Sequence, residues 1–405
     1  MRDHRNHVCA DYRTAATDLL AQCTFVRESE EVPVEEAIGR VLAETACALH
    51  ALPNKPTSNM DAIAVRFADF ADGMPDVTTW KRGEQFQFCN TGVAMPDGFD
   101  TAIAIENVEV GDDNESLVAL TYTPTDCGEA VSPVGSSLEK DTVLVEKGTL
   151  LNPVHAALLA QGGYTTVPVV RKPRVAFIPT GNELVDPCKN PPTGKNIDCN
   201  SINVCGKLAA WGAEPMRFPI VPDNWDALKA ALDQAVEEAD IVVINAGSSK
   251  GSDDFTCEIL EKYGTVLSHE TNAAPGKHAS CALLNGTPVV GISGPPIAAD
   301  LNVEMFAKPL VDAFLYGVPQ EPPVIYACLA EDMPLEPRRV NLLKRVKLVR
   351  DDNGYLWAEV LPLYAPALKE CAEADGLLIV PADSYGWHYG EQVPIQLRFP
   401  YQVRF

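Results

Sequence analysis

Two short apolar segments, each followed at once by a polar loop with glycine and a carboxylate, constrain the fold of this chain more than any other feature. Residues 175–179 run into the loop 180–184, and residues 241–244 run into the loop 245–254. Apolar segments that pass directly into such loops are typical of parallel strands in α/β proteins, and the loops at that sheet edge commonly bind phosphate groups. The sequence therefore predicts a ligand crevice at the carboxyl edge of a parallel sheet.

The region around these loops alternates between strand and helix patterns. Between about residues 172 and 319, helical periodicity occurs at residues 202–211 and 225–238, and a further strand pattern occurs at residues 288–292. Alternation of this kind is typical of a doubly wound sheet with helices on both faces.

The N-terminal part of the chain carries helical patterns. We expect residues 10–46 to be helical, because apolar residues recur at helical spacing in residues 34–42 after Pro33. A further helix is predicted at residues 153–161, where two glycines follow its end. We expect this helix to return the chain to the first helical layer.

Two other regions read as β structure. From about residue 52 to residue 144, clusters of Gly, Pro and Asp separate short alternating strands, which predicts a small β domain. After residue 320 the apolar period falls to two again, as in residues 356–360 and 377–380. These patterns predict a C-terminal β-barrel or sandwich.

The charge of the chain limits its partners. Its 405 residues carry a formal net charge of −24, which argues against binding to nucleic acid or to an anionic membrane surface. An anionic ligand would be repelled by the same field, so a phosphate site needs local cations and backbone N–H groups.

Composition also indicates a compartment. No apolar run is long enough to span a bilayer, and the N-terminal residues lead into no signal segment. The twelve cysteines are scattered without a CxxC pair, which predicts reduced thiols and no zinc site. We therefore expect a cytoplasmic protein without a membrane partner.

Five short segments carry a family pattern. Residues 58–66 (SNMDAIAVR) are similar to N-S-x-M-D-G-Y-A-V-R, and residues 90–100 (NTGVAMPDGFD) are similar to T-G-A-P-x-P-x-G-A-D. Residues 180–184 (TGNEL) match T-G-D/N-E-L, and residues 275–277 (PGK) fall on part of K-P-G-K-P. Residues 32–43 (VPVEEAIGRVLA) precede them and are similar to an opening helix.

In this order and at this spacing, the segments resemble those of the molybdopterin molybdenumtransferases (MoeA and the C-terminal part of gephyrin) along nearly the whole chain. The resemblance implies a multi-domain fold of the α/β plus β class. Its parts would be a helical dimerisation layer (residues 1–51 and 145–173), an inserted β domain (52–144), a molybdopterin-binding doubly wound α/β domain (174–319) and a C-terminal β-barrel (320–405).

The resemblance also implies an activity. Members of this family insert molybdate into adenylylated molybdopterin and release AMP with the help of a divalent metal, here expected to be Mg²⁺. The chain would then be a homodimeric transferase of molybdenum cofactor biosynthesis. Expected partners are a molybdopterin-adenylylating protein and molybdoenzyme apoproteins.

Site residues follow from the resemblance position by position. The acidic positions, expected to act in catalysis and to hold Mg²⁺, are Glu183, Asp223 and Asp254. Thr91 is also expected to act in catalysis, because it falls on a threonine that is presented across the dimer. The positions expected to bind the ligand are Thr180, Gly181, Asp198, Asn200, Gly247, Ser248, Ser249, Lys250, Gly251, Pro275, Gly276 and Lys277.

Departures from the family pattern leave other functions open. Ala274 and His278 replace a lysine and a proline of K-P-G-K-P, Pro295 replaces the asparagine of L-P-G-N-P, and Pro56 replaces an acidic residue. Retained glycine loops with fewer charges would also suit a non-catalytic molybdopterin-binding carrier or scaffold. A variant that inserts tungstate is a third interpretation.

Several single residues have a simpler interpretation beside the functional one. Asp61 and Thr91 could each only shape a turn in the β domain, and Glu183 could cap a helix. Lys250, Lys277 and His278 could be solvated surface residues.

Overall fold

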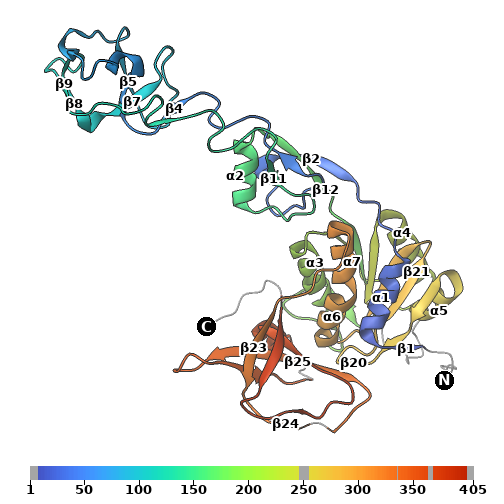
Figure 1. Ribbon diagram of the computed structural model, residues 1–405. Helices are drawn as coiled ribbons and strands as arrows, with labels where there is room; N and C mark the ends of the chain where they lie inside the picture. The colour runs from blue at the N-terminus through green and yellow to red at the C-terminus, as the bar shows by residue number, and fades with distance from the viewer. Residues whose placement is uncertain (1–7, 246–254, 335, 364–367, 399–405) are drawn as a thin grey trace. The chain divides into compact units, whose positions relative to one another are not determined.

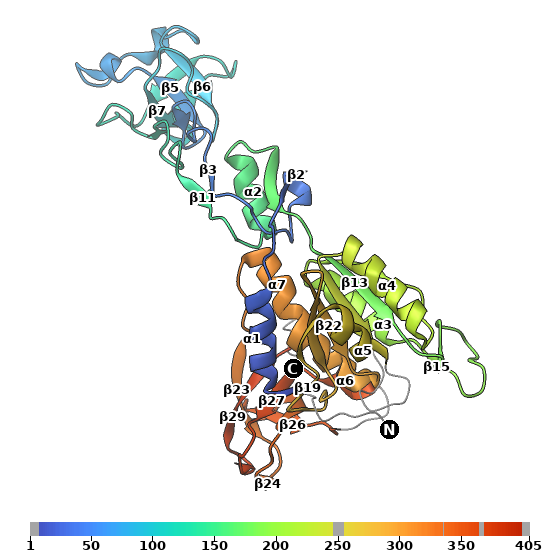
Figure 2. The same ribbon diagram turned by 90° about the vertical axis from the view of Figure 1, so that its right-hand side faces the viewer.

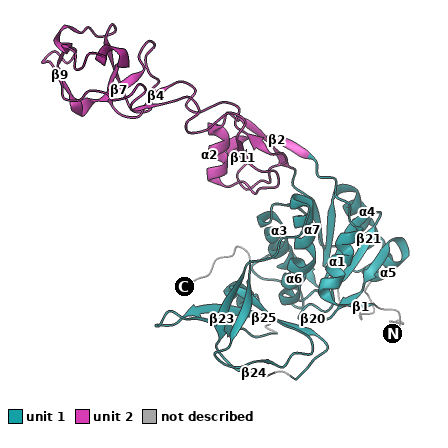
Figure 3. Cartoon of the chain, in the orientation of Figure 1, with its two compact units in different colours: residues 1–28, 171–405 teal, residues 29–170 magenta. Residues whose placement is uncertain are grey.

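The computed structural model describes residues 8–245, 255–334, 336–363 and 368–398. The chain forms two compact units (Figure 3). The larger unit contains residues 1–28 and 171–405, and the smaller unit contains residues 29–170. The boundaries of the four expected parts stay a prediction.

A six-stranded sheet forms the centre of the larger unit. Its order is β16-β13-β17-β22-β21-β18, and the first four strands are mutually parallel. Their bounds are Glu214–Arg217, Arg174–Pro179, Ile241–Asn245, Thr287–Ile292, Ser280–Leu284 and Thr265–Ser268. The parallel strands β13 and β17 are fully buried except for Arg174, as expected for strands covered on both faces.

Helices cover both faces of this sheet (Figure 1). On one face α4 (Trp225–Glu238) and α5 (Phe255–Tyr263) pack on the strands, with Leu228, Leu232 and Ala235 of α4 in the buried core. On the other face lie α3 (Asn200–Ala210) and α6 (Pro296–Asn302), which continues through the π-helical stretch η5 (Val303–Ala307) into α7 (Lys308–Tyr316). The predicted doubly wound fold is confirmed.

The N-terminal helix differs from its prediction. α1 spans Tyr12–Gln22 and packs beside α7 and against β21, within the larger unit rather than within a layer of residues 1–51 (Figure 2). Asp11 starts the helix, because its Oδ1 accepts hydrogen bonds from the backbone N–H groups of Arg13 and Thr14 at 3.0 and 3.4 Å.

The predicted helix over residues 34–42 is wrong. The chain forms strand β2 (Ser29–Pro33), then a single 3₁₀ turn at Val34–Glu36, and then an irregular turn through Gly39 at φ +79°. Val41 and Leu42 are buried, but they do not lie on a helix. They form isolated β-bridges with Leu150 and Val169, respectively. Apolar residues at helical spacing were here buried by short extended contacts, which override local propensity.

The smaller unit is mainly β structure. Its ladders are β2 with β12 (Thr166–Val170), β3 (Ala46–Cys47) with β11 (Val143–Val145), β4 (Thr57–Ser58) with β10 (Val131–Ser132), and β8 (Val108–Val110) with β9 (Leu117–Leu120). A three-stranded sheet has the order β6-β5-β7, with bounds Phe86–Cys89, Ala62–Val65 and Thr101–Ala104. The predicted helix at residues 153–161 is confirmed as α2 (Pro153–Gln161), which is capped by Asn152.

A closed β-barrel forms the C-terminal part of the larger unit. Its strands run in the order β25-β26-β23-β29-β27, and β27 pairs again with β25 to close the ring. The bounds are Asn341–Arg350, Leu356–Val360, Val324–Leu329, Gln392–Leu397 and Gly376–Val380. The barrel interpretation of the C-terminal pattern is therefore confirmed.

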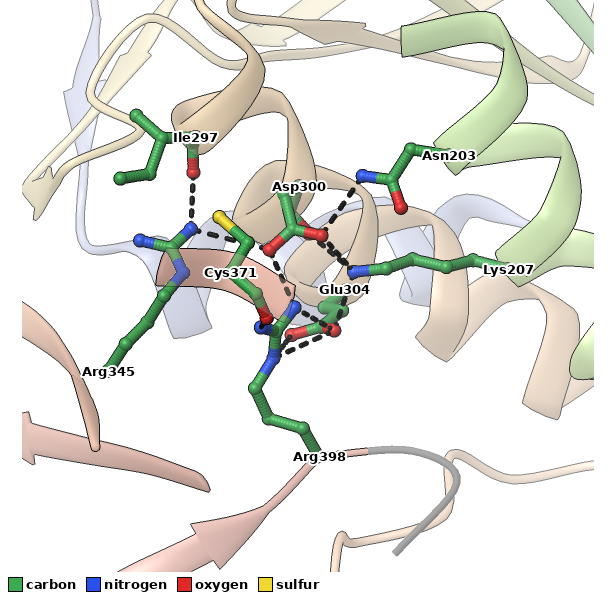
Figure 4. Close-up of polar contacts among 8 residues, drawn as sticks. All are labelled: Asn203, Lys207, Ile297, Asp300, Glu304, Arg345, Cys371 and Arg398. Carbon is green, nitrogen blue, oxygen red and sulfur yellow. Dashed lines mark hydrogen bonds and ion pairs between the residues drawn. The ribbon is translucent and has the colours of Figure 1, made fainter. Parts of the chain in front are cut away.

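A buried cluster of charges joins this barrel to the α/β domain (Figure 4). Asp300 of α6 is 2% exposed, and its carboxylate lies 2.6 Å from Nη2 of Arg398, 2.5 Å from Nζ of Lys207 and 3.3 Å from Nη2 of Arg345. Glu304 lies 2.8 Å from Arg398 and 2.7 Å from Lys207. Arg345 and Arg398 belong to the barrel side, so the ion pairs cross between the two domains.

The cluster keeps its carboxylates ionised. Burial alone would raise the pKa of Asp300, but the positive charges of Arg398 and Lys207 outweigh it and hold that pKa well below its ordinary value. The pKa of Glu304 is lowered by the same balance, and the two carboxylates raise the pKa of Arg398 against its burial. Two carboxylates and three cations therefore share one buried region.

We expect Glu304→Gln to destabilise the protein at neutral pH but not in acid. Because folding lowers the pKa of Glu304, its carboxylate stabilises the fold above the unfolded Glu pKa of about 4.3, and this contribution is lost as the pH falls through the folded pKa. The difference in unfolding free energy between wild type and variant should thus shrink below about pH 4. Urea unfolding between neutral and acid pH measures this difference.

Asp312 is another buried carboxylate whose pKa changes on folding, but it does not affect this comparison. Burial raises its pKa although Lys308 opposes the shift, so its contribution to stability has the opposite dependence on pH. Asp312 is present in both proteins, and its contribution therefore cancels in the difference. A difference between wild type and Glu304→Gln that stays constant down to acid pH would contradict an ionised Glu304 in the cluster.

Two further expectations concern cysteines and membranes. All twelve cysteines are free thiols in the structure. Among the described residues, no helix has the length and apolar character needed to cross a bilayer.

Candidate functional site

The carboxyl ends of β13 and β17 meet at one edge of the sheet, as the two predicted loops require. Oγ1 of Thr180 donates a hydrogen bond to the backbone carbonyl of Asn245 at 2.6 Å. Gly181 N–H donates to the carbonyl of Val221 at 3.1 Å, next to the bridge between Thr180 and Val221. These bonds bring the segments after β13, β16 and β17 together.

Glu183 and Asp223 lie on either side of Asn182 at this edge. Oδ2 of Asp223 accepts a hydrogen bond from Asn182 N–H at 2.9 Å, and Oδ1 of Asn182 accepts one from Asp223 N–H at 3.3 Å. The carboxylate of Glu183 folds over Gly181, where a Cβ atom would come within 2.6 Å of Oε2. Gly181 also has φ +144°, so only glycine fits this position.

The carboxylates of Glu183 and Asp223 are available to bind a metal ion. Within the described part of the chain, neither Glu183 nor Asp223 forms an ion pair with a Lys, Arg or His side chain. Asp223 is half-buried and Glu183 is exposed. Two unneutralised carboxylates beside a sheet edge suit a divalent cation such as Mg²⁺.

Lys195 is a cation at this edge that the sequence did not indicate. Its Nζ donates a hydrogen bond to the carbonyl of Asn182 at 2.5 Å. The short strands β14 (Leu184–Val185) and β15 (Asn196–Ile197) pair in parallel and hold the segment 195–197 against Glu183. Lys195 lies in a turn-rich stretch without a recognisable motif, so only the fold places it here.

Asp198 is placed within the protein rather than in an open crevice. It is 2% exposed, and Oδ1 accepts a hydrogen bond from Ser201 N–H at 3.0 Å. Oδ2 accepts from Ser201 Oγ and lies 3.2 Å from Nη2 of Arg217. Asp198 thus caps the first turn of α3, and its role in ligand binding stays a prediction.

Asn200 binds residues of two other loops at this edge through its side-chain amide N–H groups, and its side-chain oxygen has no described donor. Its Nδ2 donates to Oδ1 of Asn245 at 3.0 Å and to the carbonyl of Gly294 at 2.9 Å. Its Oδ1 is buried and has no hydrogen-bond partner among the residues that the structure describes. A buried acceptor without a donor is costly, so this oxygen suits a ligand that carries N–H groups.

The loop that contains Pro275, Gly276 and Lys277 is bound to α6 by the side chain of Asn302. Nδ2 of Asn302 donates to the carbonyl of Gly276 at 2.9 Å, while Oδ1 of Asn302 accepts from Ser293 N–H at 3.0 Å. Lys277 extends to the side chain of Glu270, with Nζ 3.2 Å from Oε2. The buried amide of Asn302 therefore sets the backbone from which Lys277 projects.

We expect Gly276→Ala to disturb this loop. Gly276 has φ +108°, and a Cβ atom there would lie 2.6 Å from Nδ2 of Asn302. The substitution should break the bond to Asn302 and cost about 1–3 kcal/mol of stability. Denaturant unfolding measures this loss, and Gly294→Ala is the control, because a Cβ at Gly294 meets no atom within 4 Å. Equal losses in the two variants would contradict the steric argument.

Thr91 belongs to the smaller unit, where Asp61 holds it. Oδ1 of Asp61 accepts from the backbone N–H of Thr91 at 2.8 Å and from its Oγ1 at 3.1 Å. Gly92 follows at φ +76° and completes the turn. Asp61 thus shapes the turn that presents Thr91, which supports its structural interpretation.

Part of the predicted site lies outside the described residues. These positions are Gly247, Ser248, Ser249, Lys250, Gly251 and Asp254. Among the residues that the structure does describe, no group of three or more His, Cys, Asp or Glu side chains could hold a metal ion. Glu183 and Asp223 therefore supply at most part of a metal site within the described chain.

A separate cavity of about 410 Å³ lies between α1, α7 and the barrel. Tyr12, Trp211 and Leu343 are among its lining residues, and none of the predicted site residues lines it. The predicted site is therefore the sheet edge and not this cavity.

Comparisons with known proteins agree with this arrangement. The family model for the MoeA N-terminal region (domain I and II) matches residues 10–163, and the model for a probable molybdopterin binding domain matches residues 176–313. A MoeA protein structure from Pyrococcus horikosii superposes with a TM-score of 0.81 at 27% identity, and the match covers 96% of this chain and 99% of that chain.

Curated relatives extend the match over nearly the whole length. A molybdopterin molybdenumtransferase of Haemophilus influenzae is 29% identical over 309 residues, which cover 73% of this chain and 76% of the relative. The molybdopterin molybdenumtransferase of Bacillus subtilis is 30% identical over 395 residues, which cover 93% of this chain and 91% of the relative. This length of match and the shared fold show that this chain belongs to the molybdopterin molybdenumtransferase family.

Proposed function

We propose that this protein inserts molybdate into adenylylated molybdopterin and releases AMP, as a cytoplasmic homodimer of molybdenum cofactor biosynthesis. The observation that carries the proposal is the carboxyl edge of the sheet, where Asp223 binds Asn182, Glu183 lies over Gly181, and Asn200 binds Asn245 at the end of β17. The Bacillus subtilis and Haemophilus influenzae relatives, both named molybdopterin molybdenumtransferase, support the reaction type.

The carboxylates support a role for Mg²⁺. Glu183 and Asp223 offer oxygen ligands of the kind that Mg²⁺ prefers, and substrate phosphates commonly complete such a site. Asp254 would be the third acidic ligand by resemblance to the family. When bound, the metal would neutralise charge on the phosphoanhydride that is broken as AMP leaves.

Cations and amides at the same edge support binding of the rest of the ligand. Lys195 lies beside Asn182, and Lys277 projects from the loop fixed by Asn302. The open Oδ1 of Asn200 would accept a hydrogen bond from an N–H group of the pterin. These residues bind and orient the ligand, and the dithiolene sulfurs of molybdopterin would receive the molybdenum.

Thr91 would complete the site from the other subunit of the homodimer. Asp61 holds the backbone and hydroxyl of Thr91 in one orientation, which is what a group that closes a site across an interface requires. The molybdopterin-adenylylating protein and the molybdoenzyme apoproteins would supply the substrate and receive the product.

The test is calorimetric binding of adenylylated molybdopterin to the purified protein with Mg²⁺ and molybdate, with AMP measured in the same sample. We expect binding and AMP release that both require Mg²⁺. Tight binding without AMP release would favour a carrier or scaffold instead, and release that responds only to tungstate would change the oxyanion. Absence of binding would refute the proposal.

A further inference from the structure

A single buried carboxylate holds both basic side chains of the loop 275–278. Oε2 of Glu270 lies 3.2 Å from Nζ of Lys277, and Oε1 lies 3.2 Å from Nδ1 of His278. The side chain of Glu270 is only 9% exposed, whereas those of Lys277 and His278 are 45% and 36% exposed. The carboxylate thus lies beneath the two bases, and the bases reach the surface.

The backbone around Glu270 is fixed on several sides. Glu270 and Thr271 form strand β19, which pairs in parallel with β1 (Cys9–Ala10), and Glu270 N–H donates to the carbonyl of Val8 at 3.2 Å. Thr271 N–H donates to the carbonyl of Lys277 at 2.8 Å. Because the segment carrying Glu270 is bonded directly to the loop carrying Lys277, the two charges stay together.

This arrangement changes how the loop attracts an anion. An ammonium group that binds a phosphate oxygen at about 3 Å would hold that phosphate within roughly 6 Å of Glu270, since Nζ already lies 3.2 Å from its carboxylate. Two like charges at that separation repel each other substantially at the effective dielectric constants of protein surfaces. Glu270 therefore opposes the anion that Lys277 attracts.

We propose that Glu270 weakens phosphate binding at Lys277. The inference deepens the proposed function: the loop would hold the phosphates of adenylylated molybdopterin loosely enough for the product to leave. Firm binding then depends on the other contacts of the edge, Glu183 and Asp223 through a metal, and Asn200. Glu270 acts on the ligand through Lys277 and through its own charge.

The test uses inorganic pyrophosphate as the anion and calorimetry as the measurement, on the full chain. Glu270→Gln keeps the shape and an acceptor oxygen but removes the charge, and it should bind pyrophosphate about 3- to 100-fold more tightly than wild type. Lys277→Gln in the same background should remove that gain. Glu270→Asp, which keeps the charge, should bind like wild type, and added salt should reduce the difference between Glu270→Gln and wild type.

Matched controls make each outcome decisive. Glu214→Gln removes one charge at the first residue of β16, on the amino edge of the sheet, and should leave pyrophosphate binding unchanged. Unchanged or weaker binding by Glu270→Gln overturns the inference, as does a gain that persists without Lys277. All variants are compared only after their unfolding midpoints are shown to match wild type within experimental error.

The pyrophosphate measurement also separates this inference from the proposed function. If Glu270→Gln tightens pyrophosphate binding while wild type releases no AMP from adenylylated molybdopterin, the inference about Glu270 stands and the proposed reaction fails. If wild type releases AMP but Glu270→Gln does not tighten binding, the reaction stands and the inference fails.

Discussion

Replacing Asp300 with asparagine is expected to loosen the barrel from the α/β domain by about 3–5 kcal/mol. Asp300 is nearly inaccessible and neutralises Lys207, Arg345 and Arg398 at once. Without its charge, Glu304 would remain as the one carboxylate of the Figure 4 cluster, bound to Lys207 and Arg398, and Arg345 would lose its ion pair with Asp300. Removing one partner of a buried pair is strongly destabilising, because the charges left behind are neither solvated nor paired.

Hydrogen exchange measures this loss where it occurs. Amide protons of β25 and β29, which carry or precede Arg345 and Arg398, should exchange roughly a hundredfold faster or more in Asp300→Asn than in wild type. Asp233→Asn is the matched control. The ion pair between Asp233 and Lys229, at 2.6 Å, lies within one helix, and the side chain of Asp233 is 46% exposed. The control should cost only about 0.3–0.5 kcal/mol. Similar small effects in both variants would show that the cluster does not hold the two domains together.

This cluster also illustrates what the sequence could not predict. Lys207, Asp300, Arg345 and Arg398 are separated by up to 191 positions along the chain, and none lies in a motif. Each residue alone is an ordinary charged side chain in an element of mixed polarity. Only the packing of the barrel on α6 and α3 places them in one buried region.

Helices were predictable where the sequence carries an N-cap residue as well as apolar residues at helical spacing. Helices α2 and α4 begin after the capping residues Asn152 and Asn224, and both match their predicted bounds. The pattern after Pro33 lacked such a side-chain cap, and Gly39 interrupted it with a left-handed turn. Helical spacing without an N-cap residue was therefore a weaker indication of a helix than spacing with one. The structure of the segment around Pro33 is set by the pairing of β2 with β12.

The candidate site was predictable to the extent that it follows strands. Glu183 follows β13, so its position at this edge follows from the predicted parallel sheet, whereas Asp223 was expected only from the family resemblance and its strand β16 was not predicted. Lys195, Asn302 and Glu270 were missed, because they reach the edge from a turn, from inside α6 and from an edge strand. Their contribution depends on tertiary contacts and not on a local pattern.

Removing the charge of Glu183 is expected to have the largest effect on activity. Its carboxylate lies over Gly181 and is not ion-paired with any described cation, and Asp223 binds the neighbouring Asn182. If Mg²⁺ bound there neutralises the breaking phosphoanhydride, its loss removes several kcal/mol of stabilisation, so Glu183→Gln should lower the rate of AMP release about 100-fold or more. The fold should be unaffected, because Glu183 is exposed and glutamine keeps its shape.

The rate is measured from adenylylated molybdopterin with molybdate over a range of Mg²⁺ concentrations. Glu183→Gln should need more Mg²⁺ to reach its maximal rate, whereas a residue that only shapes the loop would lower the rate without changing that requirement. Glu214→Gln at the opposite edge removes the same charge and should behave like wild type. Equal rates and equal Mg²⁺ dependence in Glu183→Gln and wild type would remove Glu183 from the metal site and leave Asp223 as the one acidic ligand within the described residues.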